Sequence, residues 1–150
     1  MRILAFETSA KAAGCALLED GILLGESYLN TGMTHSQTLM VMAENLLHSC
    51  GFTPSDVDAV AAAAGPGSFT GVRIGVAAAK GFAWGREIPC CGASTLQSMA
   101  LGFGAWDGVV VPGIDGPIGR VSSTVRRGQR VDVTGGALSD VITAQSWQTV

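Results

Sequence analysis

The sequence predicts an α/β fold with a mixed sheet, because three strand-like runs open the chain and helical and strand-like segments alternate after them. Residues 3–6 form an apolar run, and residues 14–18 and 22–28 form two more, joined by Asp20-Gly21. An Asp-Gly pair between two such runs is typical of a β-hairpin turn. We therefore expect three antiparallel strands first and parallel strands afterwards.

Two longer helices are expected next. Thr34-His35-Ser36-Gln37 has the spacing of a capping box, and the apolar residues up to Gly51 recur at helical spacing. A second helix is expected from Thr70 to Trp84, between strands at 57–64 and 87–92. Ser94 is a candidate cap for a short helix through Leu101, and residues 108–112 are a further strand candidate. The expected order through Leu101 is βββαβαβα.

Composition narrows the class of protein. The net charge of −3 makes the isolated chain a poor nucleic-acid binder. No apolar run approaches the roughly 20 residues of a membrane-spanning helix, and the start of the chain lacks a secretory pattern, so we expect a cytoplasmic protein without membrane contact. The four cysteines show neither zinc-site nor disulfide-framework spacing, and we interpret them as buried small apolar residues: Cys15, Cys50, Cys90 and Cys91.

Residues 65–71 read Gly-Pro-Gly-Ser-Phe-Thr-Gly. The segment lacks the Lys-Ser or Lys-Thr of a phosphate-binding P-loop and the spacing of a dinucleotide fingerprint. We interpret Gly65 and Gly67 as a tight turn, with Ser68 or Thr70 capping the following helix. Arg73 falls in the first helical turn, where the helix dipole disfavours a cation, so either an anionic group lies nearby or the side chain is simply exposed.

Small residues recur along one side of this second helix. They allow another backbone to approach closely, and that backbone belongs either to the same domain or to another subunit. The first helix is also apolar on more than one flank. The candidate partner surface therefore consists of Leu39, Met40, Met42, Ala43 and Leu47 on the first helix and Gly71, Gly75, Ala78 and Ala79 on the second.

Residues 65–81 and the opening Ile-Leu-Ala-Phe-Glu-Thr-Ser resemble the TsaB (YeaZ) family. His35-Ser36-Gln37, Thr95-Leu96 and residues 109–115 follow in the expected order, so the resemblance covers residues 1–115. It implies an ASKHA fold, in which two ribonuclease-H-like domains face each other.

The resemblance also implies a function. Members of this family are non-catalytic dimerisation subunits of the complex that transfers threonylcarbamoyl to the anticodon-adjacent adenosine of tRNA. The implied partners are TsaD and TsaE, with a homodimer when TsaD is absent and tRNA contacted only through the complex. No catalytic residue, metal or cofactor is then expected in the isolated chain, and ATP or ADP and a metal only in the assembled complex.

The alternative is a stand-alone enzyme, either an ASKHA phosphotransferase or a metallopeptidase-like protein of the kind named glycoprotease. His35 and His48 are the only histidines and lie thirteen positions apart, which argues against a metal site on one helix face. ASKHA phosphotransferases place an acid and hydroxyls near phosphate at the position that corresponds to Glu7, Thr8 and Ser9. These residues therefore form either a nucleotide site or an ordinary polar turn.

The resemblance divides the chain into an N-terminal domain at 1–103 and the start of an incomplete second domain at 104–150. Residues 116–128 depart from the family pattern, and we hypothesise a local frameshift there. The sequence leaves open whether this segment is functional and whether the chain prefers itself or TsaD as a partner.

Overall fold

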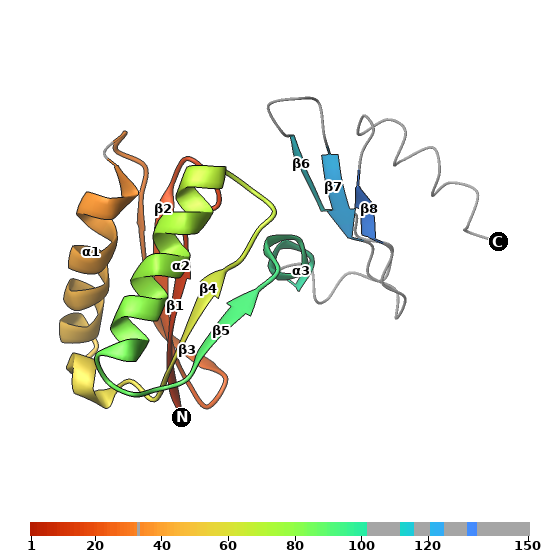
Figure 1. The fold of residues 1–150 in the computed structure, drawn as a ribbon. Helices are drawn as coiled ribbons and strands as arrows, with labels where there is room; N and C mark the ends of the chain where they lie inside the picture. Colours follow the sequence, from red (N-terminus) through yellow and green to blue (C-terminus); the bar gives the residue numbers. More distant parts are fainter. Residues whose placement is uncertain (33, 102–111, 116–120, 125–131, 135–150) are drawn as a thin grey trace. The chain divides into compact units, whose positions relative to one another are not determined.

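A five-stranded mixed sheet forms the centre of residues 1–93, in the strand order β3-β2-β1-β4-β5 (Figure 1). β1 pairs antiparallel with β2 and parallel with β4, while β2–β3 is antiparallel and β4–β5 is parallel. This topology confirms the predicted α/β class with its antiparallel beginning and parallel continuation. The strands are β1 (Arg2–Glu7), β2 (Ala13–Glu19), β3 (Ile22–Leu29), β4 (Ala59–Ala63) and β5 (Cys90–Ala93).

The computed structural model describes residues 1–32, 34–101, 112–115, 121–124 and 132–134. The chain divides into two units, Met1–Ala93 and Ser94–Val150. The predicted boundary at 103/104 falls among residues outside the described set and stays a prediction. In the described parts of the chain, no helix is long and apolar enough to cross a membrane.

The turn between β2 and β3 has the predicted hairpin geometry. Asp20 and Gly21 both have positive φ, at 50° and 83°. Positive φ at both central residues is the requirement of the turn type that matches the twist of paired strands. The local Asp-Gly signal therefore predicted both the position and the kind of turn.

Two helices, α1 (His35–Ser49) and α2 (Phe69–Trp84), pack on the same face of the sheet (Figure 1). α1 lies over β2 and β3, α2 lies over β1, β4 and β5, and the two helices contact each other. Alternate strand residues point into this layer, among them Leu4, Leu17 and Val60, which are fully buried. Each such side chain contributes roughly 1.5–3 kcal/mol by leaving water.

The ends of α1 differ in how well they were predicted. Gly51 follows the helix with φ of 80°, as expected for a left-handed helix stop. At the other end, Thr34 is the N-cap, but its side chain makes no capping hydrogen bond. The predicted capping box is therefore wrong; the backbone N–H of Gln37 donates instead to the Thr34 carbonyl.

A capping box forms at a different place, on the short 3₁₀ helix η1 (Pro54–Asp56). The backbone N–H and the hydroxyl of Thr53 both donate to Asp56 Oδ2, at 2.8 and 2.7 Å. These two bonds stabilise the carboxylate and lower the pKa of Asp56.

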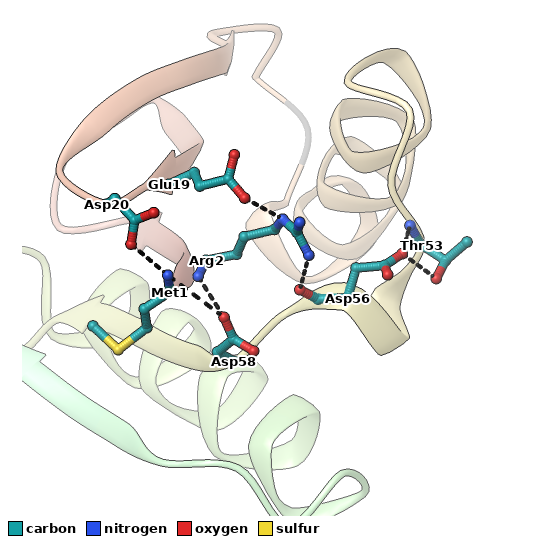
Figure 2. A network of polar contacts seen from close by, with 7 residues as sticks. All are labelled: Met1, Arg2, Glu19, Asp20, Thr53, Asp56 and Asp58. Atoms are coloured by element: carbon teal, nitrogen blue, oxygen red, sulfur yellow. Dashed lines mark hydrogen bonds and ion pairs between the residues drawn. The ribbon is translucent and has the colours of Figure 1, made fainter.

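Arg2 connects η1 to the first two strands (Figure 2). Its Nε lies 2.8 Å from Glu19 at the end of β2, and its Nη1 donates to the Asp56 carbonyl at 3.3 Å. The guanidinium also lies 4.4 Å from the centroid of the Phe52 ring. One side chain therefore joins three segments at this end of the sheet.

The cysteine interpretation is correct for only part of the set. Cys15 is buried and Cys50 is half-buried, but Cys90 and Cys91 are exposed. The reason is topological: both lie on β5, which is an edge strand in the order of the described sheet.

The second unit contains α3 (Thr95–Leu101) and a three-stranded antiparallel sheet of β6 (Gly113–Asp115), β7 (Val121–Thr124) and β8 (Asp132–Thr134). Ser94 caps α3 as predicted, because its hydroxyl accepts from the Gln97 N–H at 3.4 Å. The strand expected at 108–112 lies outside the described residues except for Pro112. Within 116–128, only β7 is described.

Candidate functional site

The polar turn after β1 is closed by hydrogen bonds to the start of α2. The Thr8 side chain is 1% exposed, and its hydroxyl donates to the Gly71 carbonyl at 2.8 Å. The Ser9 carbonyl accepts from the Ser68 N–H at 2.6 Å, and the Ser9 N–H donates to Glu7 Oε1, also at 2.6 Å. The Thr8 hydroxyl and the N–H and carbonyl of Ser9 thus have partners within the protein.

Three glycines make this contact possible. A Cβ added at Gly67 would overlap Ser9, and a Cβ at Gly71 would overlap the Thr8 carbonyl oxygen. A Cβ at Gly75, one helical turn further, would overlap Thr8 Oγ1. The glycine-rich motif therefore lets α2 lie directly against the turn after β1.

The remaining residues of the motif start the helix. Ser68 is the N-cap, and its hydroxyl accepts from the Gly71 N–H at 3.2 Å. Gly65 has φ of 101°, a conformation that favours glycine. Thr70 is exposed in the first turn, so Ser68 is the cap of the two candidates. The interpretation of the motif as a strand-to-helix corner is confirmed.

This geometry bears on the nucleotide-site hypothesis for residues 7–9, which stays a prediction. A phosphate needs free N–H or hydroxyl donors. The Thr8 hydroxyl and the Ser9 N–H are already bonded inside the protein, and α2 fills the space beside them. These two donors are therefore occupied within the protein, and the half-buried Glu7 accepts the bond from Ser9.

The predicted partner surface also needs correction. Most of its residues are buried in the core between the sheet and the helices, so the chain's own packing explains their small or apolar character. Ala78 is half-buried and Met40 is 41% exposed, so these two remain accessible. The buried residues are Leu39, Met42, Ala43, Leu47, Gly71, Gly75 and Ala79.

A groove of about 380 Å³ lies between α1 and α2. Met40, Leu47 and Phe82 contribute apolar surface, with Glu44 and Arg86 as its charged lining residues. Arg86 is held in place, because its Nε donates to the Pro54 carbonyl at 3.0 Å and its guanidinium lies 4.1 Å from the Phe82 ring centroid. Gly81 also lines the groove, and a Cβ there would meet nothing within 4 Å.

Sequence reasoning missed a second hollow near the end of α2. A cavity of about 540 Å³ is lined by Lys80, Trp84, Glu87, Ile88 and Cys90, among others. Trp84 is 88% exposed. A large aromatic residue at the end of a helix otherwise rich in alanine and glycine was the available signal.

Arg73 is exposed. Exposure was one of the two alternatives for this side chain, the other being a nearby anionic group. Its guanidinium lies 5.0 Å from the ring centroid of Phe69, one turn earlier on α2. Within the described ranges it forms no ion pair, so an anionic partner stays a prediction.

Over the same ranges, no group of three or more His, Cys, Asp or Glu side chains has the arrangement of a metal site. The His35 ring contacts the Ala10 carbonyl, with Nε2 at 3.0 Å.

Comparison with known proteins gives consistent results. The family model described as TsaD, tRNA N6-adenosine threonylcarbamoyltransferase, matches residues 30–147. The tRNA threonylcarbamoyladenosine biosynthesis protein TsaB of Bacillus subtilis is 38% identical over 81% of this chain and 53% of its own length. The protein of the same name from Escherichia coli is 41% identical over the same shares.

A solved structure supports the same comparison. YeaZ from Pseudomonas aeruginosa superposes with a TM-score of 0.76 at 31% identity, covering 90% of this chain and 65% of that one. This likeness confirms the predicted fold class. The chain spans about half the length of the curated relatives it matches.

Proposed function

Because the chain belongs to the TsaB (YeaZ) family and has its ASKHA-like α/β fold, we propose that it serves in tRNA threonylcarbamoyladenosine biosynthesis as a non-catalytic subunit. In this proposal it pairs with TsaD, joins TsaE in the same complex, and contacts tRNA only through that complex. In the absence of TsaD it pairs with a second copy of itself.

The observation that carries the non-catalytic role is the closed turn after β1. The Thr8 hydroxyl donates to α2 and the Ser9 N–H donates to Glu7, and the glycines of the motif bring the α2 backbone against the turn. The strand end that a phosphotransferase would use for phosphate therefore has a structural role here. Any nucleotide or metal that the reaction needs is held by the partner subunits, and the isolated chain needs no cofactor.

We assign partner binding to the groove between α1 and α2. Met40 and the adjacent Val41 are 41% and 56% exposed, which leaves apolar surface beside the groove in water. The bare Cα of Gly81 allows another chain to approach closely. An apolar side chain of the partner in this groove would cover both features.

Co-purification with TsaD of the same organism tests the proposal. The wild-type chain is expected to bind TsaD, and Gly81→Gln is expected to reduce binding because its side chain extends into the groove without disturbing the core. Asn45→Gln, an exposed change on α1 outside the groove lining, is the matched control. If Gly81→Gln retains TsaD binding, the interface with TsaD lies outside this groove.

An activity measurement addresses the enzyme alternative. The 150-residue chain alone is expected to show no ATP hydrolysis, and Glu7→Ala is expected to leave that baseline unchanged. Turnover by the isolated chain that disappears in Glu7→Ala would contradict the non-catalytic role.

A further inference from the structure

The cavity at the end of α2 is a second hollow, separate from the groove between the helices. Its volume of about 540 Å³ lies within the range of about 300–1,000 Å³ that is typical of small-molecule sites. Trp84 offers it a large aromatic surface, while Ala83 is buried and Ile88 packs against the hydrophobic core. We call it the Trp84 cavity, and its lining consists of Lys80, Ala83, Trp84, Glu87, Ile88 and Cys90.

Two opposite charges line the Trp84 cavity without neutralising each other. Lys80 and Glu87 are both exposed, and no ion pair joins them. Over the ranges that the structure describes, neither side chain pairs with any other charged group. A small molecule that carries both a cation and an anion would therefore find a partner for each charge in this cavity.

The backbone at Glu87 places a carboxylate where glycine is the usual residue. Glu87 has φ of 56°, and the N–H of the next residue, Ile88, donates back to the Ala83 carbonyl at 3.2 Å. This conformation costs free energy for any residue that has a Cβ. A glycine at position 87 would avoid the cost but would remove the carboxylate from the cavity. Unfavourable backbone conformations of this kind concentrate at functional sites.

We propose that the Trp84 cavity binds a free zwitterionic amino acid with an aromatic or large apolar side chain. The ammonium group of this amino acid lies beside the Glu87 carboxylate and the indole ring of Trp84, which attracts cations. Its carboxylate accepts a hydrogen bond from Lys80 Nζ. Its side chain covers the apolar surface of Ile88. This inference goes beyond the proposed function, because it concerns a small molecule and needs no partner subunit.

Other classes of molecule match the lining of the Trp84 cavity less completely. A phosphate group would pair with Lys80 alone, and Glu87 would oppose it. A simple amine would pair with Glu87 and leave Lys80 without a partner. A protein chain carries its α-ammonium and α-carboxylate at opposite ends, so a residue inside it supplies neither charge. The free amino acid is the class that uses both charges and the aromatic surface together.

Titration of the isotope-labelled chain with L-phenylalanine, followed by NMR, tests the inference. The indole N–H signal of Trp84, identified by its loss in Trp84→Phe, is expected to shift with a dissociation constant on the order of 0.1–1 mM, a typical affinity for a molecule of about twelve heavy atoms. N-acetyl-L-phenylalanine lacks the ammonium group and phenethylamine lacks the carboxylate. Each is expected to bind at least about tenfold more weakly, because one charge of the cavity then has no partner.

Variants of the two charged residues assign the contacts. Glu87→Gln and Lys80→Gln are each expected to weaken L-phenylalanine binding about five- to tenfold, because each loses a charge-assisted hydrogen bond. Glu44→Gln makes the same change at an exposed position on α1, outside the cavity lining, and is expected to bind within about twofold of the wild type. Circular dichroism checks that each variant folds.

The adjacent cysteines on β5 provide a second measurement with an internal control. Both are exposed, but Cys90 lines the Trp84 cavity and Cys91 does not. L-phenylalanine at about ten times its dissociation constant is expected to slow the alkylation of Cys90 by iodoacetamide about tenfold, because the free cavity is then rare. Cys91 is expected to react at an unchanged rate. Fragment ions in mass spectrometry distinguish the two sites.

Three results would overturn the inference. The first is L-phenylalanine that neither shifts the Trp84 signal nor protects Cys90. The second is equal binding of L-phenylalanine and its N-acetyl derivative, because the ammonium group would then have no role. The third is protection of Cys90 by TsaD with none by L-phenylalanine, which would assign the cavity to a subunit interface. Since the first two measurements use the chain alone, they are independent of whether it binds TsaD.

Discussion

Thr8, in the turn after β1, is joined to Gly71 of α2 by a hydrogen bond and by close packing. The Thr8 hydroxyl donates to the Gly71 carbonyl at 2.8 Å, and the Thr8 carbonyl oxygen occupies the space where a Cβ of residue 71 would stand. The same pair thus supplies a buried hydrogen bond and a steric requirement for glycine. Both can be tested independently.

Gly71→Ala is expected to lower the free energy of unfolding by about 1–3 kcal/mol, because the added methyl group must displace backbone at the turn. Gly81→Ala is the matched control on the same helix, where a Cβ meets nothing. It is expected to raise the free energy of unfolding by about 0.5–1 kcal/mol through helix propensity. Urea unfolding measures both, and equal effects would show that the Thr8 contact does not restrict position 71.

Thr8→Val removes the hydroxyl and keeps the shape of the side chain. We expect a loss of about 1–2 kcal/mol in the free energy of unfolding, because a buried hydrogen bond is removed. Thr8→Ser keeps the hydroxyl and serves as the comparison. If Val is tolerated better than Ser at this position, packing of the methyl group outweighs the bond to Gly71.

Glu87 adopts φ of 56°, which is uncommon for a residue with a Cβ. It follows the end of α2, where the Ile88 N–H donates back to the Ala83 carbonyl at 3.2 Å and where glycine is the usual residue. Glu87→Gly is therefore expected to raise the free energy of unfolding by about 0.5–1 kcal/mol. Glu87→Ala keeps a Cβ and is expected to change it little. A destabilised Glu87→Gly would indicate that the carboxylate itself contributes to folding.

The four cysteines are expected to differ in reactivity towards iodoacetamide. Cys90 and Cys91 are exposed on β5 and should be alkylated in the native protein. Burial raises the pKa of Cys15 to about 11, so its thiol stays protonated and should react only after unfolding. Peptide mapping by mass spectrometry reads out each site, and rapid native alkylation of Cys15 would contradict its burial.

The same shift predicts how stability depends on pH. The Cys15 pKa is higher in the folded chain than its ordinary value of 9.0, so the unfolded chain loses this proton first as pH rises. The stabilisation that the protonated Cys15 thiol gives the folded chain is complete below about pH 9 and is lost as pH approaches about 11. Between these values the free energy of unfolding should fall more steeply for the wild type than for Cys15→Ala. If the free energy of unfolding depends on pH in the same way for both proteins, the loss of stability comes from ionisable groups other than Cys15.

Local signals predicted the features that depend on neighbours in the sequence. The Asp20-Gly21 turn, the buried stripe of α1 and a hydroxyl cap at Ser68 or Thr70 all follow from spacing within a few residues, and the structure selects Ser68. Features set by distant contacts were predicted only in part: the small residues of the second helix indicated a close backbone approach, but not which residue approaches. Positions 71 and 75 require glycine because Thr8 lies against them. Cys90 is exposed because β5 is the edge strand of the described sheet. Neither relationship is visible before the topology is known.

The central position of β1 also determines the order in which the fold can be completed. Its antiparallel neighbour β2 follows within a few residues, but its parallel neighbour β4 lies 56 positions away, where Ile3 pairs with Ala59. During synthesis the β1–β3 meander can therefore form while β4 is still inside the ribosome. Closing the long loop is the slow step for such pairings. Until then, one side of β1 has its amide groups in water, and the emergence of β4 and α2 completes the sheet.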